Sequence, residues 1–171
     1  IQSHRNNSAI CEFSSKLYPS FEKSIPCICS ECRKVKNDEG VFLLRNEEID
    51  AFKSSYRNER IGILRWQKSI NPEKNFGDSK GLTYDRVIIF PTGTIITYLK
   101  NGKLTKTVKN KKGDFEEEDA FDIAKFYVAV TRARYTVGIV YDYKDSENFI
   151  DGIVKYSQRK EVKNLPDKVT E

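Results

Sequence analysis

An uninterrupted apolar run in the middle of the chain does most to limit the possible folds. Residues 87–90 of the segment DRVIIFP, 85–91, are all apolar, with no polar residue between them. A strand with one face in water alternates apolar and polar residues, whereas a strand inside a parallel sheet is buried on both faces and does not. We therefore expect 85–91 to be an interior strand of a parallel sheet.

Strand-like and helix-like segments alternate along the chain. Apolar runs predict strands at 40–45, 61–66, 85–91 and 135–142. Apolar residues at helical spacing predict helices at 6–18, 46–56, 117–132 and 146–157. The segment 92–100 fits either structure. This alternation predicts an α/β layered domain whose mostly parallel sheet is flanked by helices.

Two segments interrupt the alternation. Residues 20–38 are polar and contain three of the four cysteines, and we expect an irregular insertion there. Residues 101–116 carry lysines followed by carboxylates, which predicts a charged, solvated loop whose acids lead into the N-terminus of the 117–132 helix. The domain is expected to cover 1–157, with a polar tail at 158–171.

Length and composition narrow the class of protein. The 171 residues suffice for one domain with its own core, and 38% hydrophobic and 32% charged residues are typical of a folded chain. We find no apolar run long enough to span a bilayer and no secretory signal, so a cytoplasmic location is expected. The chain begins with Ile1, and we interpret it as part of a longer polypeptide. A net charge of +5 permits a nucleic-acid partner without establishing one.

The cysteines raise the question of a metal. Cys27, Cys29 and Cys32 form a C-x-C-x2-C cluster, Cys11 lies in a predicted helix, and His4 is the only histidine. A zinc site takes about four nitrogen or sulfur ligands. Reduced, partly buried thiols are therefore the favoured interpretation and no metal ligand is assigned. A zinc-organised interaction domain is the alternative.

Arginines stand where predicted elements meet. Arg132 and Arg134 lie between a predicted helix and a predicted strand, and Arg5 precedes the first helix. Ligands of open α/β sheets bind beyond the carboxyl ends of the strands, and we expect these arginines there with the glycine-containing loop 75–85. Guanidinium groups match phosphate oxygens, so the three segments could grip a polyphosphate. From spacing alone, surface residues or helix caps are the simpler interpretation.

Three segments carry a more specific pattern, in the order QSHRNNSAICEFSSKLY at 2–18, SKGLTYDRVIIFP at 79–91 and KFYVAVTRAR at 125–134. They resemble the fourth, fifth and sixth motifs of superfamily 1 DNA helicases of the UvrD/Rep type. The resemblance implies the second, C-terminal RecA-like motor domain, with a P-loop-NTPase-like fold. In that family the phosphate loop belongs to the first motor domain, and this sequence contains no G-x-x-x-x-G-K-[ST] motif.

The resemblance also implies ligands and roles. ATP and Mg would be held mainly by an upstream RecA-like domain of the same chain, and the partner would be single-stranded DNA. Arg132 and Arg5 match the two arginines that reach the γ-phosphate across the interdomain cleft, and we assign them as catalytic. Lys80 and Gly81 match the loop that couples nucleotide to DNA, and with Thr83 they are assigned to the nucleotide.

The remaining assignments fall where the sequence departs from the family. Asn75, Gly77 and Ser79 are assigned to DNA. The family has a threonine that contacts DNA phosphate at the position of Asn75, a histidine at Gly77 and an acidic residue that meets the nucleotide sugar at Thr83. The chain is thus predicted to be the motor domain of an ATP-dependent DNA helicase, inactive in isolation. The alternative is a non-catalytic nucleic-acid- or partner-binding module that keeps the helicase fold.

Overall fold

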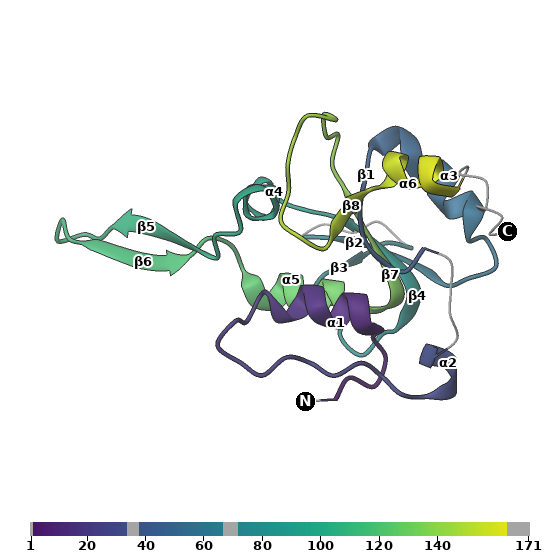
Figure 1. Cartoon of the computed structure of the whole chain (residues 1–171). Helices are drawn as coiled ribbons and strands as arrows, with labels where there is room; N and C mark the ends of the chain where they lie inside the picture. The colour runs from purple at the N-terminus through teal and green to yellow at the C-terminus, as the bar shows by residue number, and fades with distance from the viewer. Residues whose placement is uncertain (1, 34–37, 67–71, 164–171) are drawn as a thin grey trace, which may run out of the picture.

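A six-stranded sheet forms the centre of the molecule. The computed structural model describes residues 2–33, 38–66 and 72–163 (Figure 1). The strands of the sheet are β1 (Gly40–Leu44), β2 (Ile61–Arg65), β3 (Lys74–Asn75), β4 (Tyr84–Phe90), β7 (Ala133–Val140) and β8 (Ile153–Lys155). Their order is β3-β2-β4-β7-β1-β8, and every neighbouring pair is parallel. The predicted α/β class with a parallel sheet is therefore confirmed.

Helices cover both faces of this sheet. They are α1 (Ser8–Ser15), α2 (Ser30–Arg33), the 3-10 turn η1 (Asn46–Glu48), α3 (Ile49–Ser55), α4 (Gly93–Asn101), α5 (Ile123–Val130) and α6 (Tyr156–Lys163). Helices α1 and α5 lie side by side on one face, while α3 and α6 lie on the other (Figure 1). The segment 92–100, for which helix and strand were both possible, is helical as α4.

Strand β4 shows why the central apolar run does not alternate. Val87 and Ile89 point to the core that α1, α4 and α5 cover, whereas Ile88 packs with Phe52 and Tyr156 of the opposite face. All three β4 residues are completely buried. Burial on both faces removes the need for polar residues, so the predicted interior strand is confirmed.

The charged stretch after α4 is a β-hairpin, so the predicted loop at 101–116 was wrong. Strands β5 (Thr105–Lys109) and β6 (Phe115–Asp119) pair antiparallel and project from the body of the molecule (Figure 1). Lys106 faces Glu118 across the pair with 3.0 Å between charged atoms, and opposite charges on facing strands stabilise such pairing. Gly113 turns the chain with φ +94°, in the left-handed region that favours glycine.

Two helix boundaries also differ from the sequence prediction. The 117–132 helix begins only at Ile123, because Asp122 caps α5 by accepting the Lys125 N–H at 2.9 Å. The helix predicted at 146–157 is replaced by a turn, strand β8 and the start of α6. Since α6 runs from 156 to 163, the predicted tail at 158 begins inside a helix. None of the helices in the described part of the chain is long and apolar enough to cross a membrane.

Gly138 packs closely against the neighbouring strand of the sheet. It lies in β7, and a Cβ atom built there would contact the Leu44 side chain, with Cγ at 3.1 Å. Leu44 is completely buried and has little room to move. We expect Gly138→Ala to lower the free energy of unfolding by about 1–3 kcal/mol through overpacking.

Urea unfolding followed by circular dichroism measures this change. Gly93→Ala is the matched control, because a Cβ atom at Gly93 meets nothing within 4 Å. A Gly138→Ala midpoint equal to that of the control would contradict the prediction.

Candidate functional site

The predicted motif segments meet at the amino edge of the sheet. Strand β4 begins at Tyr84 and β7 at Ala133, so Thr83 and Arg132 stand immediately before parallel neighbouring strands. The Tyr84 N–H donates to the Arg132 carbonyl at 2.9 Å, which joins the two segments. The expectation that they lie beyond the carboxyl ends was wrong, because each polar segment precedes its strand.

Two buried asparagines attach the N-terminal segment to this edge. The Asn6 side-chain amide donates to the carbonyls of Thr131 at 3.0 Å and Ala133 at 2.7 Å. The Asn7 backbone N–H donates to the Arg134 carbonyl at 3.1 Å, and the Asn7 side-chain oxygen caps α1. These bonds hold Arg5 beside the start of β7.

Arg5 and Arg132 converge on one backbone oxygen. The Leu82 carbonyl accepts from Arg5 Nη1 at 2.9 Å and from Arg132 Nη1 at 3.4 Å. Arg5 Nη1 also donates to the Thr83 hydroxyl at 3.2 Å. Among the residues that the structure describes, neither guanidinium forms an ion pair with a carboxylate. Two half-buried cations thus share neutral acceptors, which is a setting that attracts an anion.

Arg132 also caps the preceding helix. Its Nε donates to the Val128 carbonyl in the last turn of α5 at 3.0 Å, and Nη2 lies 3.5 Å from the Thr131 hydroxyl. Burial lowers the pKa of Arg132 from its ordinary value, and the positive charge of Arg5 lowers it further. Burial and the charge of Arg5 both make the protonated form of Arg132 less favourable, and a bound phosphate would stabilise that form. The long bonds to Leu82 and Thr131 are weak enough for a phosphate to replace them.

The two neighbouring arginines of VTRAR have different surroundings. Arg134 Nη1 lies 4.0 Å from a carboxylate oxygen of Asp85, and its side chain is 35% exposed. Arg132 has the Leu82 and Val128 carbonyls as its acceptors instead. Thr131 is buried and its hydroxyl accepts weakly from Arg132, whereas Tyr127 packs edge-on against Tyr18.

The loop before β4 holds the residues predicted to contact DNA and nucleotide. The Asn75 side chain accepts the Asp78 N–H at 2.8 Å and starts a turn. Ser79 is completely buried and its hydroxyl donates to the Phe76 carbonyl at 2.7 Å, so its side chain faces inward. Lys80 and Gly81 are exposed, and Gly81 has φ +80°. Asn75 and Gly77 are partly exposed near the same turn.

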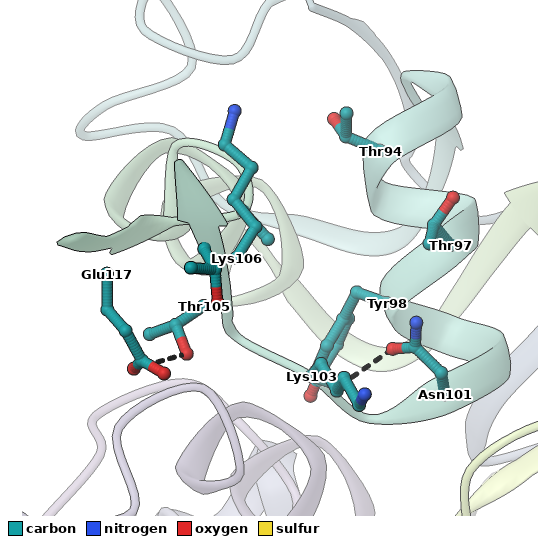
Figure 2. A pocket seen from close by; sticks show the side chains of 10 residues that line it. Thr94, Thr97, Tyr98, Asn101, Lys103, Thr105, Lys106 and Glu117 are labelled. Carbon is teal, nitrogen blue, oxygen red and sulfur yellow. Dashed lines mark hydrogen bonds between the residues drawn. The ribbon is translucent and has the colours of Figure 1, made fainter. Parts of the chain in front are cut away.

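A pocket lies away from the arginines. It has a volume of about 610 Å³ between α4 and the hairpin, and Figure 2 shows Thr97, Tyr98 and Lys103 on its walls. The Thr105 hydroxyl there donates to Glu117 at 3.1 Å. Helix α4 follows the carboxyl end of β4, so this pocket is formed at the opposite end of the strand from Arg132. It shares no residue with the predicted site.

Comparison with known proteins identifies no family. No protein-family model matches the chain, and neither does any curated protein. Solved structures that resemble its fold include an Arterivirus nonstructural protein 10 (helicase), at 15% identity and TM-score 0.47 over 84% of this chain and 25% of that one. The C-terminal domain of a possible DNA helicase from Lactobacillus plantarum WCFS1 has 13% identity and TM-score 0.45, over 81% of this chain and 86% of that one.

A third solved structure has a similar identity and TM-score. PRRSV nsp10 (helicase) has 15% identity and TM-score 0.45, over 85% of this chain and 24% of that one. The chain therefore spans about a quarter of the viral proteins. At these values the similarities do not decide function, which has to be argued from the site.

Sequence reasoning missed one essential part of this site. Asn6 carries no motif signal of its own, yet its buried amide connects the Arg5 segment to β7. Two successive asparagines before a helix do not by themselves indicate a buried tether. The second asparagine alone is enough to cap the helix, so the first has no evident role in the sequence. The shared acceptor, the Leu82 carbonyl, is a backbone group that no residue pattern specifies.

Proposed function

We propose that this chain is the second RecA-like motor domain of an ATP-dependent DNA helicase or translocase. In this proposal Arg132 and Arg5 act as arginine fingers toward the γ-phosphate of ATP. The nucleotide and its Mg are held mainly by an upstream RecA-like domain of the same chain. The motif resemblance motivates the assignment, and the geometry of the two arginines carries it.

The supporting observation is the convergence of two guanidinium groups on the Leu82 carbonyl. Like charges placed together raise the free energy of the site unless an anion neutralises them. Phosphoryl transfer spreads negative charge over the γ-phosphoryl oxygens, and a positioned arginine stabilises that charge. Arg5 and Arg132 come from different segments, so they can approach one phosphate from two sides.

The position at the amino edge supports a shared site. A doubly wound domain binds its own nucleotide beyond the carboxyl ends of its strands. Here the arginines stand at the opposite edge and the sequence lacks a phosphate loop. An arginine at that edge serves best a nucleotide that another domain presents.

The loop before β4 offers a route from nucleotide to DNA. When Arg5 and Arg132 bind phosphate, their guanidinium groups no longer donate hydrogen bonds to the Leu82 carbonyl and the Thr83 hydroxyl. The turn that starts at Asn75 is then free to shift. We assign the exposed Lys80 and Gly81 to this coupling, with Asn75 and Gly77 toward single-stranded DNA and Ser79 as a buried support of the turn.

The test is DNA-stimulated ATP hydrolysis by the longer protein that contains this domain. Phosphate release is measured with and without single-stranded DNA, at saturating ATP and Mg. A rate that rises with DNA supports the motor. If the longer protein binds DNA but hydrolyses no ATP, the second candidate, a non-catalytic binding module, is supported. Thr83 favours this candidate, because its hydroxyl already accepts a hydrogen bond from Arg5.

The isolated 171 residues give a further prediction. We expect them to hydrolyse no ATP above the uncatalysed background. Without a phosphate loop the ATP is not held in place, so the two arginines have no transition state to stabilise. Phosphate release from the purified domain measures this, and the longer protein serves as positive control. Substantial turnover by the domain alone would contradict the half-site.

A further inference from the structure

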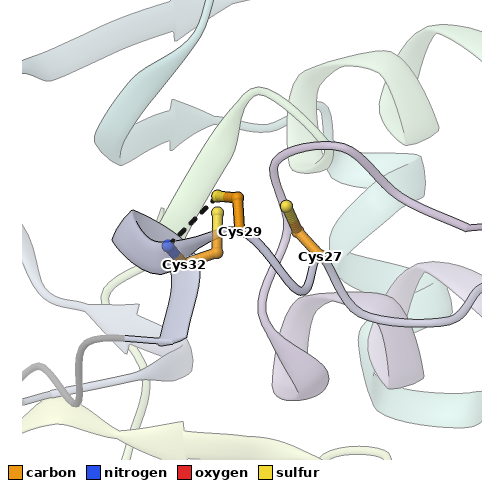
Figure 3. Close-up of side chains that lie close together, drawn as sticks. All are labelled: Cys27, Cys29 and Cys32. Atoms are coloured by element: carbon orange, nitrogen blue, oxygen red, sulfur yellow. Dashed lines mark hydrogen bonds between the residues drawn. The ribbon is translucent and has the colours of Figure 1, made fainter.

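Three cysteines of the 20–38 insertion lie close together. The Sγ atoms of Cys27, Cys29 and Cys32 are all within 4.8 Å of one another (Figure 3). Tetrahedral zinc with Zn–S bonds near 2.3 Å places its sulfurs about 3.8 Å apart, so a small movement brings the three into range. All four cysteines of the chain are described, and none is in a disulfide.

One backbone N–H of the cluster points at a cysteine sulfur. The Cys32 N–H donates to Cys29 Sγ at 3.4 Å, and Cys32 lies in the short helix α2 (Figure 3). A backbone N–H directed at sulfur favours the thiolate, which is the form that binds metal. Cys27 and Cys32 are buried, whereas Cys29 is exposed and leaves the cluster accessible from solvent.

The described part of the insertion, 20–33, has little core of its own. Phe21, Ile25 and Ile28 are 70%, 56% and 58% exposed, and a segment that buries so little apolar surface gains little from folding. Small units of this kind are often held by a metal or a disulfide. With no disulfide present, the three thiols are the groups able to cross-link it.

The cluster is attached to the segment that carries Arg5. The Cys27 N–H donates to the Asn6 carbonyl at 2.9 Å, and Cys32 Sγ donates to the Arg5 carbonyl at 3.3 Å. The Ser3 N–H donates to the Ile25 carbonyl at 2.8 Å. The insertion is therefore hydrogen-bonded to the backbone on both sides of Arg5 in the chain.

We propose that Cys27, Cys29 and Cys32 bind one zinc-type divalent ion, which fixes the insertion against the Arg5 segment. The three thiols release their protons to solvent on binding, and three sulfur–metal bonds form. The Cys32–Arg5 hydrogen bond is exchanged for one of these bonds, while the backbone bonds of Cys27 and Ser3 are kept. The fourth position is left to solvent.

Metal content is the first test. The chain is purified under reducing conditions, its zinc is measured by mass spectrometry, and Co²⁺ is added to the metal-free protein. We expect about one zinc per chain and a thiolate-to-cobalt charge-transfer band. Cys29→Ser should weaken zinc affinity at least about tenfold, and since Cys29 is exposed the variant should still fold. Cys29→His should retain binding, because imidazole is also a zinc ligand.

Cys11→Ala is the matched control, since Cys11 is a buried cysteine outside the cluster. It should bind zinc as the unmodified chain does. Two results would overturn the site: no zinc and no cobalt band in the unmodified chain, or an equal loss of binding in Cys11→Ala with circular dichroism unchanged.

The positioning role rests on the proposed function, whereas metal binding does not. In the longer protein, Cys29→Ser should lower DNA-stimulated ATP hydrolysis and Cys29→His should restore it. Zinc bound without any hydrolysis in the unmodified protein would defeat the motor and leave the metal site standing. Hydrolysis without zinc would defeat the metal site alone. Hydrolysis that is equal in Cys29→Ser and the unmodified protein, despite loss of zinc, would overturn the positioning role.

Discussion

Replacing Arg132 with alanine is expected to lower DNA-stimulated ATP hydrolysis by the longer protein about a thousandfold or more. ATP binding should be largely kept, because the proposal assigns most nucleotide contacts to the upstream domain. The expected effect is large because, in the proposed function, the guanidinium stabilises charge that develops on the γ-phosphoryl group in the transition state. The measurement is kcat for phosphate release, beside nucleotide affinity from fluorescence titration.

Arg134→Ala is the matched control for this prediction. Arg134 stands two residues away, has the same side chain and pairs with Asp85 at the surface. We expect kcat within about a few fold of the unmodified protein, because loss of a long, partly exposed ion pair has a small effect. Equal losses in the two variants would indicate a structural effect of the VTRAR segment, and an unchanged rate in Arg132→Ala would remove the finger assignment.

Arg132→Lys separates charge from shape. Lysine keeps the positive charge but loses the planar fork that bonds two phosphate oxygens. It also loses the Nε bond to the Val128 carbonyl, so the cap of α5 is removed in both variants. A rate in Arg132→Lys well above that of Arg132→Ala, with equal thermal midpoints, would point to the charge at the phosphate and away from the cap.

The layers of the fold could be predicted from the sequence because buried strands and helix faces consist mostly of apolar residues. Val87 to Phe90 form an unbroken apolar run, which is the pattern expected of a strand buried on both faces of a parallel sheet. The hairpin at 105–119 was missed for the opposite reason. Its strands are exposed and charged, so they carry none of the apolar alternation that identifies a strand, and cross-strand partners such as Lys106 and Glu118 are 12 positions apart.

The arginines of the site could be named from motifs, whereas their surroundings could not. Whether Arg132 is a cap or a phosphate ligand depends on atoms 50 residues away, at the Leu82 carbonyl. The structure answers that it caps α5 and also faces Arg5. The edge of the sheet was mispredicted because the general rule gives the carboxyl ends of the strands, whereas these polar segments come directly before β4 and β7.

Arg86 gives the largest expected change in stability. Its side chain is 1% exposed, Nε lies 2.7 Å from Glu59, and Nη1 donates to the Asp38 carbonyl at 3.1 Å. The guanidinium carbon lies 3.6 Å from the centre of the Tyr56 ring. We expect Arg86→Ala to lower the free energy of unfolding by about 3–5 kcal/mol, because it leaves the partly buried Glu59 carboxylate without its partner and removes a large, completely buried side chain.

Urea unfolding compares this variant with Lys106→Ala. The Lys106–Glu118 pair has both side chains about half exposed, and its loss should cost less than about 1 kcal/mol. The double change Arg86→Met with Glu59→Leu should recover part of the loss, because apolar side chains of similar size leave no buried charge unpaired. If Arg86→Ala unfolds at the same urea concentration as Lys106→Ala, the buried pair contributes no more than a surface one. Because Arg86 does not touch the Arg5–Arg132 site, its variants should retain kcat at temperatures where they are folded, which separates the stability of the domain from its chemistry.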